Sequence, residues 1–370
     1  MHMKKNSAVI LLSILLFIYF ASGADRLPAE ELSLPSGTGI DIEQRGSEDL
    51  LYTISISAYI FSQNSKVITK LYTGTATSPA ETRKDRQRKM DKRFILGLEK
   101  VDIFSEDYAK SGIRPTMDIL LSSNTVNDLS EVAVCKGKAS SLLEYKIPAY
   151  SSSSDYIQGM LKSASNYNFF EKDFQLLDFL VRIESEGINA VLPYIEIREE
   201  GLQITGAALF KNDKMVAKTN IEDARILNTL KNTKGKGMLT IVKDSKHYID
   251  FYSKVRRTVS CKREDDKYKF NINLKFIGEI VNNELYSQIG YSEKTKKEFE
   301  NILESKIEDM CNKFLDKMKN EYKVDSLGLG RVAAAKYGRG TNVDWDQIVC
   351  NSEIKVKVNV KLDRQGRGDY

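Results

Sequence analysis

The chain has 370 residues, of which 41% are hydrophobic and 29% charged. This composition excludes collagen-like, coiled-coil-only and wholly disordered proteins, and at about 150 residues per domain the length predicts two or three domains. The net charge of +5 is too small and too diffuse to indicate a nucleic-acid partner. Only two histidines occur, His2 and His247, so the sequence offers almost no residues for histidine-based catalysis or metal binding.

The start of the chain has the anatomy of a signal peptide. Lys4 and Lys5 precede the apolar run 8–21, and small residues follow it. A bilayer-spanning helix needs about 20 apolar residues, so this shorter run favours a signal peptide over residues 1–23, cleaved between Gly23 and Ala24. The alternative is an uncleaved N-terminal membrane anchor. Either reading predicts that the body of the protein lies outside the cytoplasm.

The four cysteines, Cys135, Cys261, Cys311 and Cys350, lie far apart and form no CxxC pair. This spacing excludes a zinc ribbon and a thioredoxin-like motif. An even number of cysteines outside the cytoplasm permits disulfides, with three possible connectivities. Cys311 falls within the apolar stripe of a predicted helix, which favours a buried free thiol.

Residues 24–200 alternate between strand and helix patterns, which predicts an N-terminal region of two α/β subdomains. A capping box at 78–81 opens one helix, and Gly112 is placed to end another. The predicted strands are 36–42, 51–61, 96–103 and 132–135, and the predicted helices are 78–94, 105–109, 139–143, 155–165 and 171–184.

A basic run at 83–93 holds seven basic and two acidic residues. We interpret it as a solvated helix face. The functional alternatives are contact with anionic lipid headgroups or with an acidic partner subunit.

Residues 201–365 predict a C-terminal domain, followed by a loose tail at 366–370. Asn212 and Asp213 join two strands as a hairpin turn, and Asn220 with Asp223 caps a helix. The helix at 293–322 is amphipathic, and the final strand alternates strictly between valine or other aliphatic residues and lysine or asparagine. The predicted strands are 202–210, 214–218, 237–242, 248–259, 267–281 and 353–362. Together the two regions predict an α+β protein of mixed sheets with covering helices.

The usual catalytic motifs do not occur in the sequence. The stretch 235–238 fails as a phosphate loop because Met238 stands where a hydroxyl is needed, and no GxSxG elbow occurs. The acidic doublets lie in turn contexts that favour solvation. We therefore expect no catalytic residue, no cofactor and no metal site.

One glycine-containing stretch follows the long helix, and we interpret it as a tight turn. Its context, after a helix instead of a strand, excludes the dinucleotide fingerprint that it superficially matches. The residues concerned are Lys323, Asp325, Gly328, Gly330 and Arg331.

This stretch, placed before Trp345 and an alternating lysine/valine strand, resembles the C-terminal signature of the GerAC-type C subunits of spore germinant receptors. Segments 38–41, 96–98, 108–113, 136–139 and 206–214 resemble further blocks of that family. The resemblance gives the five signature residues a structural or interface role.

The resemblance implies the family's three-domain architecture and a non-catalytic subunit on the outer face of the spore inner membrane. It also implies partnership with a membrane-embedded A subunit and a transporter-like B subunit, in the response to nutrient germinants. Family members usually carry a lipobox ending in Gly-Cys-Trp-Asp, which Gly23-Ala24-Asp25 does not match, so lipid anchoring by that route does not carry over. The rival hypothesis is an exported solute-binding protein or an enzyme of an unrelated class.

Overall fold

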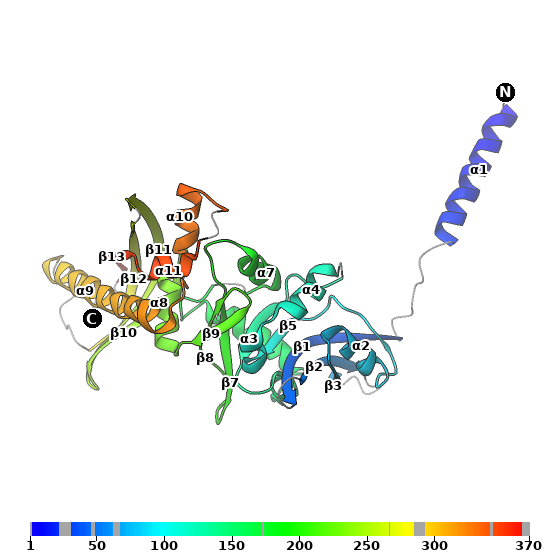
Figure 1. Cartoon of the computed structure of the whole chain (residues 1–370), viewed down its shortest axis with the longest axis horizontal. Helices are drawn as coiled ribbons and strands as arrows, with labels where there is room; N and C mark the ends of the chain where they lie inside the picture. Colours follow the sequence, from blue (N-terminus) through cyan, green and yellow to red (C-terminus); the bar gives the residue numbers. More distant parts are fainter. Residues whose placement is uncertain are drawn as a thin grey trace.

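The structure is a computed structural model, and it describes residues 2–21, 31–45, 49–61, 67–123, 125–171, 174–265, 267–284, 293–340 and 343–364. Within them the chain forms two β-sheets with helices packed on both, so the predicted α+β class is confirmed (Figure 1). The expected cleavage site at Gly23 and Ala24 and the expected loose tail lie outside the described residues.

The first sheet has nine strands, eight of them in the order β3-β2-β1-β5-β6-β7-β8-β9, with β4 paired to β1. Its four middle strands, β1, β5, β6 and β7, are parallel, and antiparallel hairpins extend it on both sides. The strands are β1 (Leu32–Arg45), β2 (Asp49–Phe61), β3 (Val67–Ala76), β4 (Arg93–Phe94), β5 (Val101–Ser105), β6 (Glu131–Cys135), β7 (Val191–Arg198), β8 (Gly201–Lys211) and β9 (Lys214–Lys218).

Helices cover both faces of this sheet, because its central strands are apolar on both sides. All five residues of β6 are buried: Val132 and Val134 join the core under α3, α4 and α7, whereas Ala133 and Cys135 join the core under α5 and α6. Such continuous burial is typical of parallel strands. The helices are α2 (Pro79–Gln87), which packs on β3, α3 (Glu106–Ser111), α4 (Arg114–Ser122), α5 (Ala139–Glu144), α6 (Ser153–Ala164) and α7 (Leu176–Glu184).

Two predicted boundaries in this half are wrong. The helix expected to run to residue 94 ends at Gln87, because the chain must return to β4, where Phe94 is buried. The strand expected at 96–103 begins only at Val101, since Gly97 turns the chain with φ +105° and its N–H bonds the Glu99 carboxylate at 2.7 Å. Strand β3 and helix α4 have no counterpart among the sequence predictions.

The basic run 83–93 is a solvated face with one exception. Arg86 is buried, donates to the Ile54 carbonyl at 3.3 Å and lies over the Phe94 ring. Its neighbour Asp85 pairs with Arg88 at 3.0 Å and with Lys89 at 2.6 Å.

The second sheet has four strands in the order β10-β11-β12-β13. The last strand, β13, lies at the edge and pairs with β12 in parallel, and the other strand pairs are antiparallel. The strands are β10 (Lys234–Asp244), β11 (His247–Glu264), β12 (Lys267–Asn283) and β13 (Glu353–Arg364), and the helices are α8 (Ile221–Lys231), α9 (Glu293–Lys317), α10 (Leu329–Tyr337) and α11 (Trp345–Cys350). The predicted long helix is α9, whose last turn, η3 (Met318–Tyr322), is π-helical.

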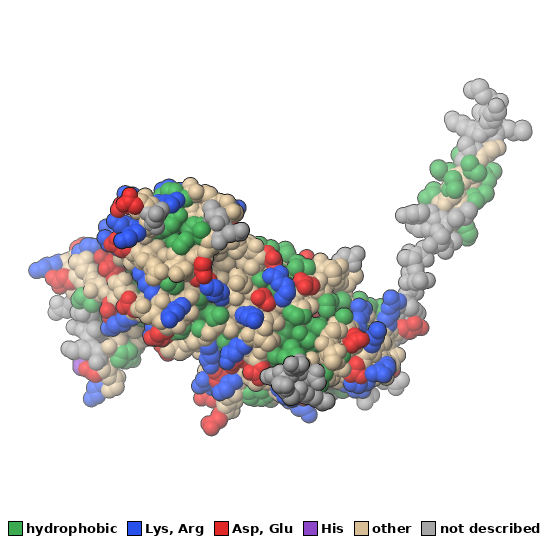
Figure 2. Space-filling view, in the orientation of Figure 1, with side chains coloured by type: hydrophobic (Ala, Val, Ile, Leu, Met, Phe, Trp, Pro, Cys, Tyr) green, Lys and Arg blue, Asp and Glu red, His purple; other side chains and the backbone are tan. Residues whose placement is uncertain are grey.

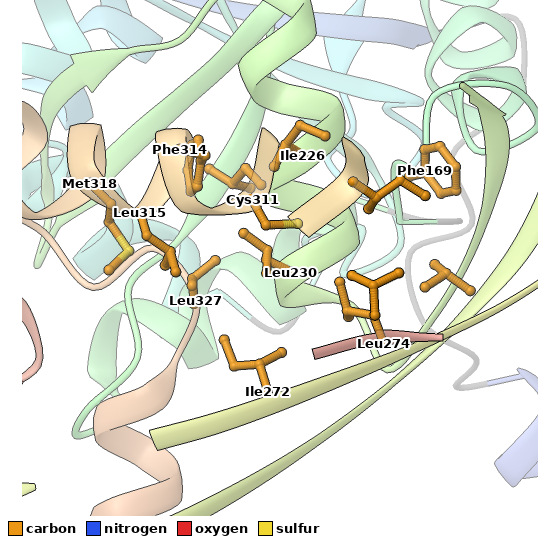
Figure 3. Close-up of a cluster of buried hydrophobic side chains, with 14 of the residues drawn as sticks. Phe169, Ile226, Leu230, Ile272, Leu274, Cys311, Phe314, Leu315, Met318 and Leu327 are labelled. Carbon is orange, nitrogen blue, oxygen red and sulfur yellow. The ribbon is translucent and has the colours of Figure 1, made fainter. Parts of the chain in front are cut away.

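The core of this half lies between α8, α9 and one face of the sheet. Figure 3 shows Cys311 and Phe314 of α9 near Ile226 of α8, with Ile272 of β12 across the core. Leu209 of β8 belongs to the same cluster, so this core reaches the first sheet. The predicted boundary between residues 200 and 201 lies at the β7–β8 turn of the first sheet.

The structure describes all four cysteines, and each is a free thiol. Cys311 is fully buried, as its position in the apolar stripe predicts. Burial raises the pKa of the Cys311 thiol to about 12.

The free edge of β13 is closed by the side chains of α9. Glu300, Glu304 and Glu308 follow one another at four-residue spacing and so share one helix face. Their carboxylates accept the backbone N–H groups of Leu362 at 3.0 Å, Val360 at 2.9 Å and Val358 at 2.8 Å. Three alternate donors in the second half of the edge strand are therefore bonded to a helix instead of to another strand.

The N-terminal helix α1 (His2–Ala21) stands apart from the folded body (Figure 1). Its described large hydrophobic side chains, from Val9 to Phe17, are exposed, as Figure 2 shows. Among the described helices, none is both long and apolar enough to cross a membrane.

We predict that Glu304→Ala lowers the free energy of unfolding by about 1–3 kcal/mol, because it leaves the N–H of Val360 without its acceptor at a partly buried edge. Urea unfolding of the full chain measures this. The control is Asp309→Ala on the exposed side of α9, which removes only the exposed ion pair with Lys313 and should cost under about 0.5 kcal/mol. Equal losses in the two variants would contradict the edge-closing role.

Candidate functional site

The five signature residues lie in one segment, residues 323–331, which follows η3 and includes the first turn of α10; we call it the signature loop. Lys323 ends the π-helical turn in a left-handed conformation, with φ 53°, and its N–H donates to the Met318 carbonyl at 2.9 Å. Gly328, with φ 67°, precedes α10. The expected tight turn is therefore present, and it leads directly into a helix that the sequence analysis did not predict.

Asp325 organises this signature loop from inside. Its side chain is buried, and its carboxylate accepts the N–H of Leu327 at 3.1 Å and the N–H of Gly330 at 2.7 Å. Its own N–H donates to Oδ1 of Asp346 at 2.7 Å. Burial, with a smaller contribution from the nearby Asp346, raises the pKa of Asp325 to about 6 against the lowering effect of the backbone N–H donors.

The signature loop contacts the first sheet through residues 186–189, which connect α7 to β7. The N–H of Arg331 donates to the Gly187 carbonyl at 2.6 Å. Asn189 donates through Nδ2 to Oδ1 of Asp346 at 2.6 Å and to the Asp325 carbonyl at 3.3 Å. These bonds attach the loop to the layer of helices on the first sheet.

Glycine is required at position 330 because the two segments are in contact there. A Cβ on Gly330 would lie 2.7 Å from the Cβ of Trp345 and 3.1 Å from the Cα of Gly187. Trp345 itself donates through Nε1 to Glu186 at 2.9 Å. The close approach of three chain segments leaves no room for a side chain.

The signature loop also contacts the second sheet. Arg257 of β11 donates through Nη2 to the Leu327 carbonyl at 3.1 Å and through Nη1 to the Lys231 carbonyl at 3.0 Å. Lys211, at the end of β8, approaches Oδ2 of Asp346 at 3.4 Å. The loop thus bonds to elements of both sheets, and we call this region the junction.

A buried ion-pair group provides a second connection between the halves. Glu171 pairs with Arg182 of α7 at 2.7 Å and with Lys231 of α8. Burial raises the pKa of Glu171, but the charges of Lys231 and Arg182 lower it more, to about 2. Removing one partner from such a group leaves an uncompensated buried charge, so the group fixes α7 relative to α8.

The structure brings together some of the signature residues and leaves others at the surface. Asp325, Gly328 and Gly330 shape the loop, whereas the side chains of Lys323 and Arg331 are exposed. The sequence analysis did not predict that the signature loop bonds to Asn189, Asp346 and Arg257. Asp344 capping α11, with Gln347 N–H at 3.1 Å, is a signal that could have located Asp346.

The chemistry available at the junction is limited to holding chain segments in place. Both oxygens of Asp325 accept backbone N–H groups, so the carboxylate is committed to structure. Within the described residues, no group of three or more histidine, cysteine, aspartate and glutamate side chains is placed to hold a metal ion.

Comparison with known families agrees with this geometry. The model described as "Spore germination protein N-terminal domain" matches residues 25–197, and the model described as "Spore germination B3/ GerAC like, C-terminal" matches residues 205–366. The chain belongs to the GerAC-type family of germinant receptor C subunits. The two matched segments meet at the β7–β8 hairpin, and the signature loop lies in the second of them.

Similar proteins align with different fractions of this GerAC-type chain. "Spore germination protein GerQC" of Bacillus cereus is 22% identical over 96% of this chain and 98% of its own length. "Spore germination protein B3" of Bacillus subtilis (strain 168) is 25% identical over 48% of each chain. The crystal structure of the GerBC protein has the same fold, with a TM-score of 0.58 at 17% identity, covering 88% of this chain and 97% of that one. Membership of the family supports a role in spore germination.

We predict that Gly330→Ala destabilises the chain by about 1–3 kcal/mol, because the added Cβ overlaps Trp345 and Gly187. Thermal and urea unfolding measure the effect. The matched control is Gly159→Ala in α6, where a Cβ meets nothing within 4 Å and alanine should stabilise the helix by about 0.5–1 kcal/mol. A Gly330→Ala chain as stable as wild type would show that the segments are not in close contact.

The raised pKa of Asp325 predicts a pH dependence. Its pKa is 3.8 when unfolded and about 6 when folded, so the folded state binds the extra proton between these values, and the free energy of unfolding falls as the pH rises through this range. The full difference corresponds to about 3 kcal/mol. In Asp325→Asn this fall should be missing, which urea unfolding from pH 4 to pH 7 measures. Parallel pH profiles for the variant and wild type would contradict the assignment, and exposed Asp309→Asn is the control.

Proposed function

We propose that this chain is the non-catalytic C subunit of a nutrient germinant receptor, and that it acts at the outer face of the spore inner membrane with the receptor's membrane-embedded A and B subunits. Membership of the family supports the receptor role. The observation that carries the non-catalytic part is the junction, where the signature residues hold two sheets together and Asp325 is bonded by backbone N–H groups on both oxygens.

The N-terminal segment supports the extracytoplasmic, membrane-associated part of the proposal. Lys4 and Lys5 precede the apolar stretch of α1, and the large hydrophobic side chains from Val9 to Phe17 are exposed. Exposed apolar side chains on a helix outside the folded body need an apolar environment during export or at the membrane. We propose cleavage between Gly23 and Ala24, with attachment through partner subunits, because the lipobox cysteine does not occur in the sequence.

The two-sheet body supports an assembly role. A subunit that works by contact must present its surfaces in a fixed relative position, and the junction with the Glu171 ion-pair group fixes the two sheets. We propose that the A and B subunits bind faces on both sheets, so that the rigidity of the junction affects assembly.

Deletion of the gene tests the proposed function. We expect spores that form normally and stay dormant but lose the response to one set of nutrients, and restoration by the wild-type gene. Copurification of the tagged chain with the A and B subunits from spore inner membranes measures assembly. Normal germination on every nutrient, in a strain lacking other germinant receptors of this type, would overturn the proposal, as would recovery of the chain from the spore core.

A further inference from the structure

The outer face of the second sheet carries a band of positive charge. In each strand the residues that alternate with buried core residues point to the opposite face. The strand register aligns Lys234, Arg256 and Lys275 across three strands, and it aligns Lys236, Lys254 and Lys361 in the adjacent row, with Ile277 between the last two. We call these six cations the cationic band.

The side chains of the cationic band lack ion-pair partners within the described residues. None of the six side chains forms an ion pair with any residue in the described part of the chain. Like charges directly opposite on paired strands are destabilising. By contrast, two lysines farther along the same face are paired, Lys269 with Glu264 at 2.6 Å and Lys355 with Glu353 at 2.9 Å. The band therefore keeps a repulsion that these two lysines have lost, which points to an anionic ligand.

A cavity of about 470 Å³ lies at the β10 end of the cationic band. The end of α6 contributes Lys162 and Asn166, and Phe170 and Val255 add buried apolar side chains. The residues of the cavity include five cations and no carboxylate. Its volume is in the range of about 300–1,000 Å³ that small-ligand sites have, and its lining combines positive charge with apolar surface.

We propose that the cationic band and this cavity bind the headgroups of anionic phospholipids. An anionic phospholipid joins a negatively charged phosphate headgroup to an apolar acyl portion, which matches the mixed lining of the cavity. The band covers four strands, about 15 Å at the usual strand spacing, so it faces several anionic groups at once, as a lipid surface presents them. Multiple exposed lysine and arginine side chains near such a surface add up in affinity and are screened by salt.

This inference rests on the proposed function, because a place at the membrane brings lipid phosphates within reach of the sheet. It adds that the second sheet faces the bilayer with its outer face, opposite α9. The basic helix α2 is the natural comparison, since its exposed cations lie on the first sheet and its Asp85 is already paired.

The test measures cosedimentation of the full chain with lipid vesicles. Binding to phosphatidylcholine vesicles measures the baseline contribution of the apolar helix α1. Mixed phosphatidylcholine–phosphatidylglycerol vesicles add the anionic headgroup. The band variant is Lys234→Gln, Lys236→Gln, Lys254→Gln and Arg256→Gln together. The control variant removes the same charge from the region of α2: Arg83→Gln, Lys84→Gln, Lys92→Gln and Arg93→Gln together.

We expect phosphatidylglycerol to increase binding of wild type and of the control variant, with the increase lost at high salt. In the band variant, the affinity gained from phosphatidylglycerol should fall about 100-fold. Each removed charge contributes about 1 kcal/mol of binding free energy, and the remaining cations offset part of the loss. The melting temperature of the band variant should be at least as high as that of wild type, because the substitutions remove like-charge repulsion. An unchanged increase in the band variant would overturn the inference.

Two further outcomes separate the ligand sources and the two proposals. Displacement of the chain from anionic vesicles by inorganic phosphate at constant ionic strength would identify a free-phosphate site and overturn the lipid assignment. The germination assay on the deletion strain is independent of vesicle binding. Loss of germination on deletion, together with vesicle binding that ignores phosphatidylglycerol, would overturn only the lipid inference and leave the receptor role standing.

Discussion

The fold depends on one buried carboxylate at the junction of two sheets. Asp325 accepts two backbone N–H groups of its own loop, while its N–H is held by Asp346. These bonds hold residues 323–331 in the conformation that has the left-handed turn at Gly328 and the close packing at Gly330. The approach of α10 and α11 to the first sheet follows from that packing. These hydrogen bonds between backbone and carboxylate act together with the shared core and the Glu171 ion-pair group to position the two sheets.

The same arrangement explains why the family signature contains acidic and glycine residues. Asp325 is needed as an acceptor, and burial shifts its titration toward neutral pH without placing it beside a reacting group. Gly330 is needed because Gly187 and Trp345 occupy the space of a side chain. A signature of this kind identifies a joint between layers, which suits a receptor subunit that works through its surfaces.

Local patterns in the sequence predicted the elements whose causes are local. Asn212 adopts a left-handed turn between β8 and β9, Asn220 caps α8 through the Asp223 N–H, and β13 alternates as its lysines and valines indicate. The failures have non-local causes. The helix predicted to reach residue 94 ends earlier because Phe94 is buried in β4, which pairs with β1. Asn189 meets Asp346 across 157 residues, a distance that no periodicity or capping rule spans, so the signature loop was found but its partners were not.

The glutamates of α9 have a consequence for how other proteins can attach. Unpaired edge strands are the usual place where a foreign peptide joins a sheet by adding a strand. On β13 the N–H groups of Val358, Val360 and Leu362 are already taken by a helix of the same chain. Strand addition along this margin is therefore blocked, and any subunit that docks near it must recognise side chains instead of completing the backbone ladder.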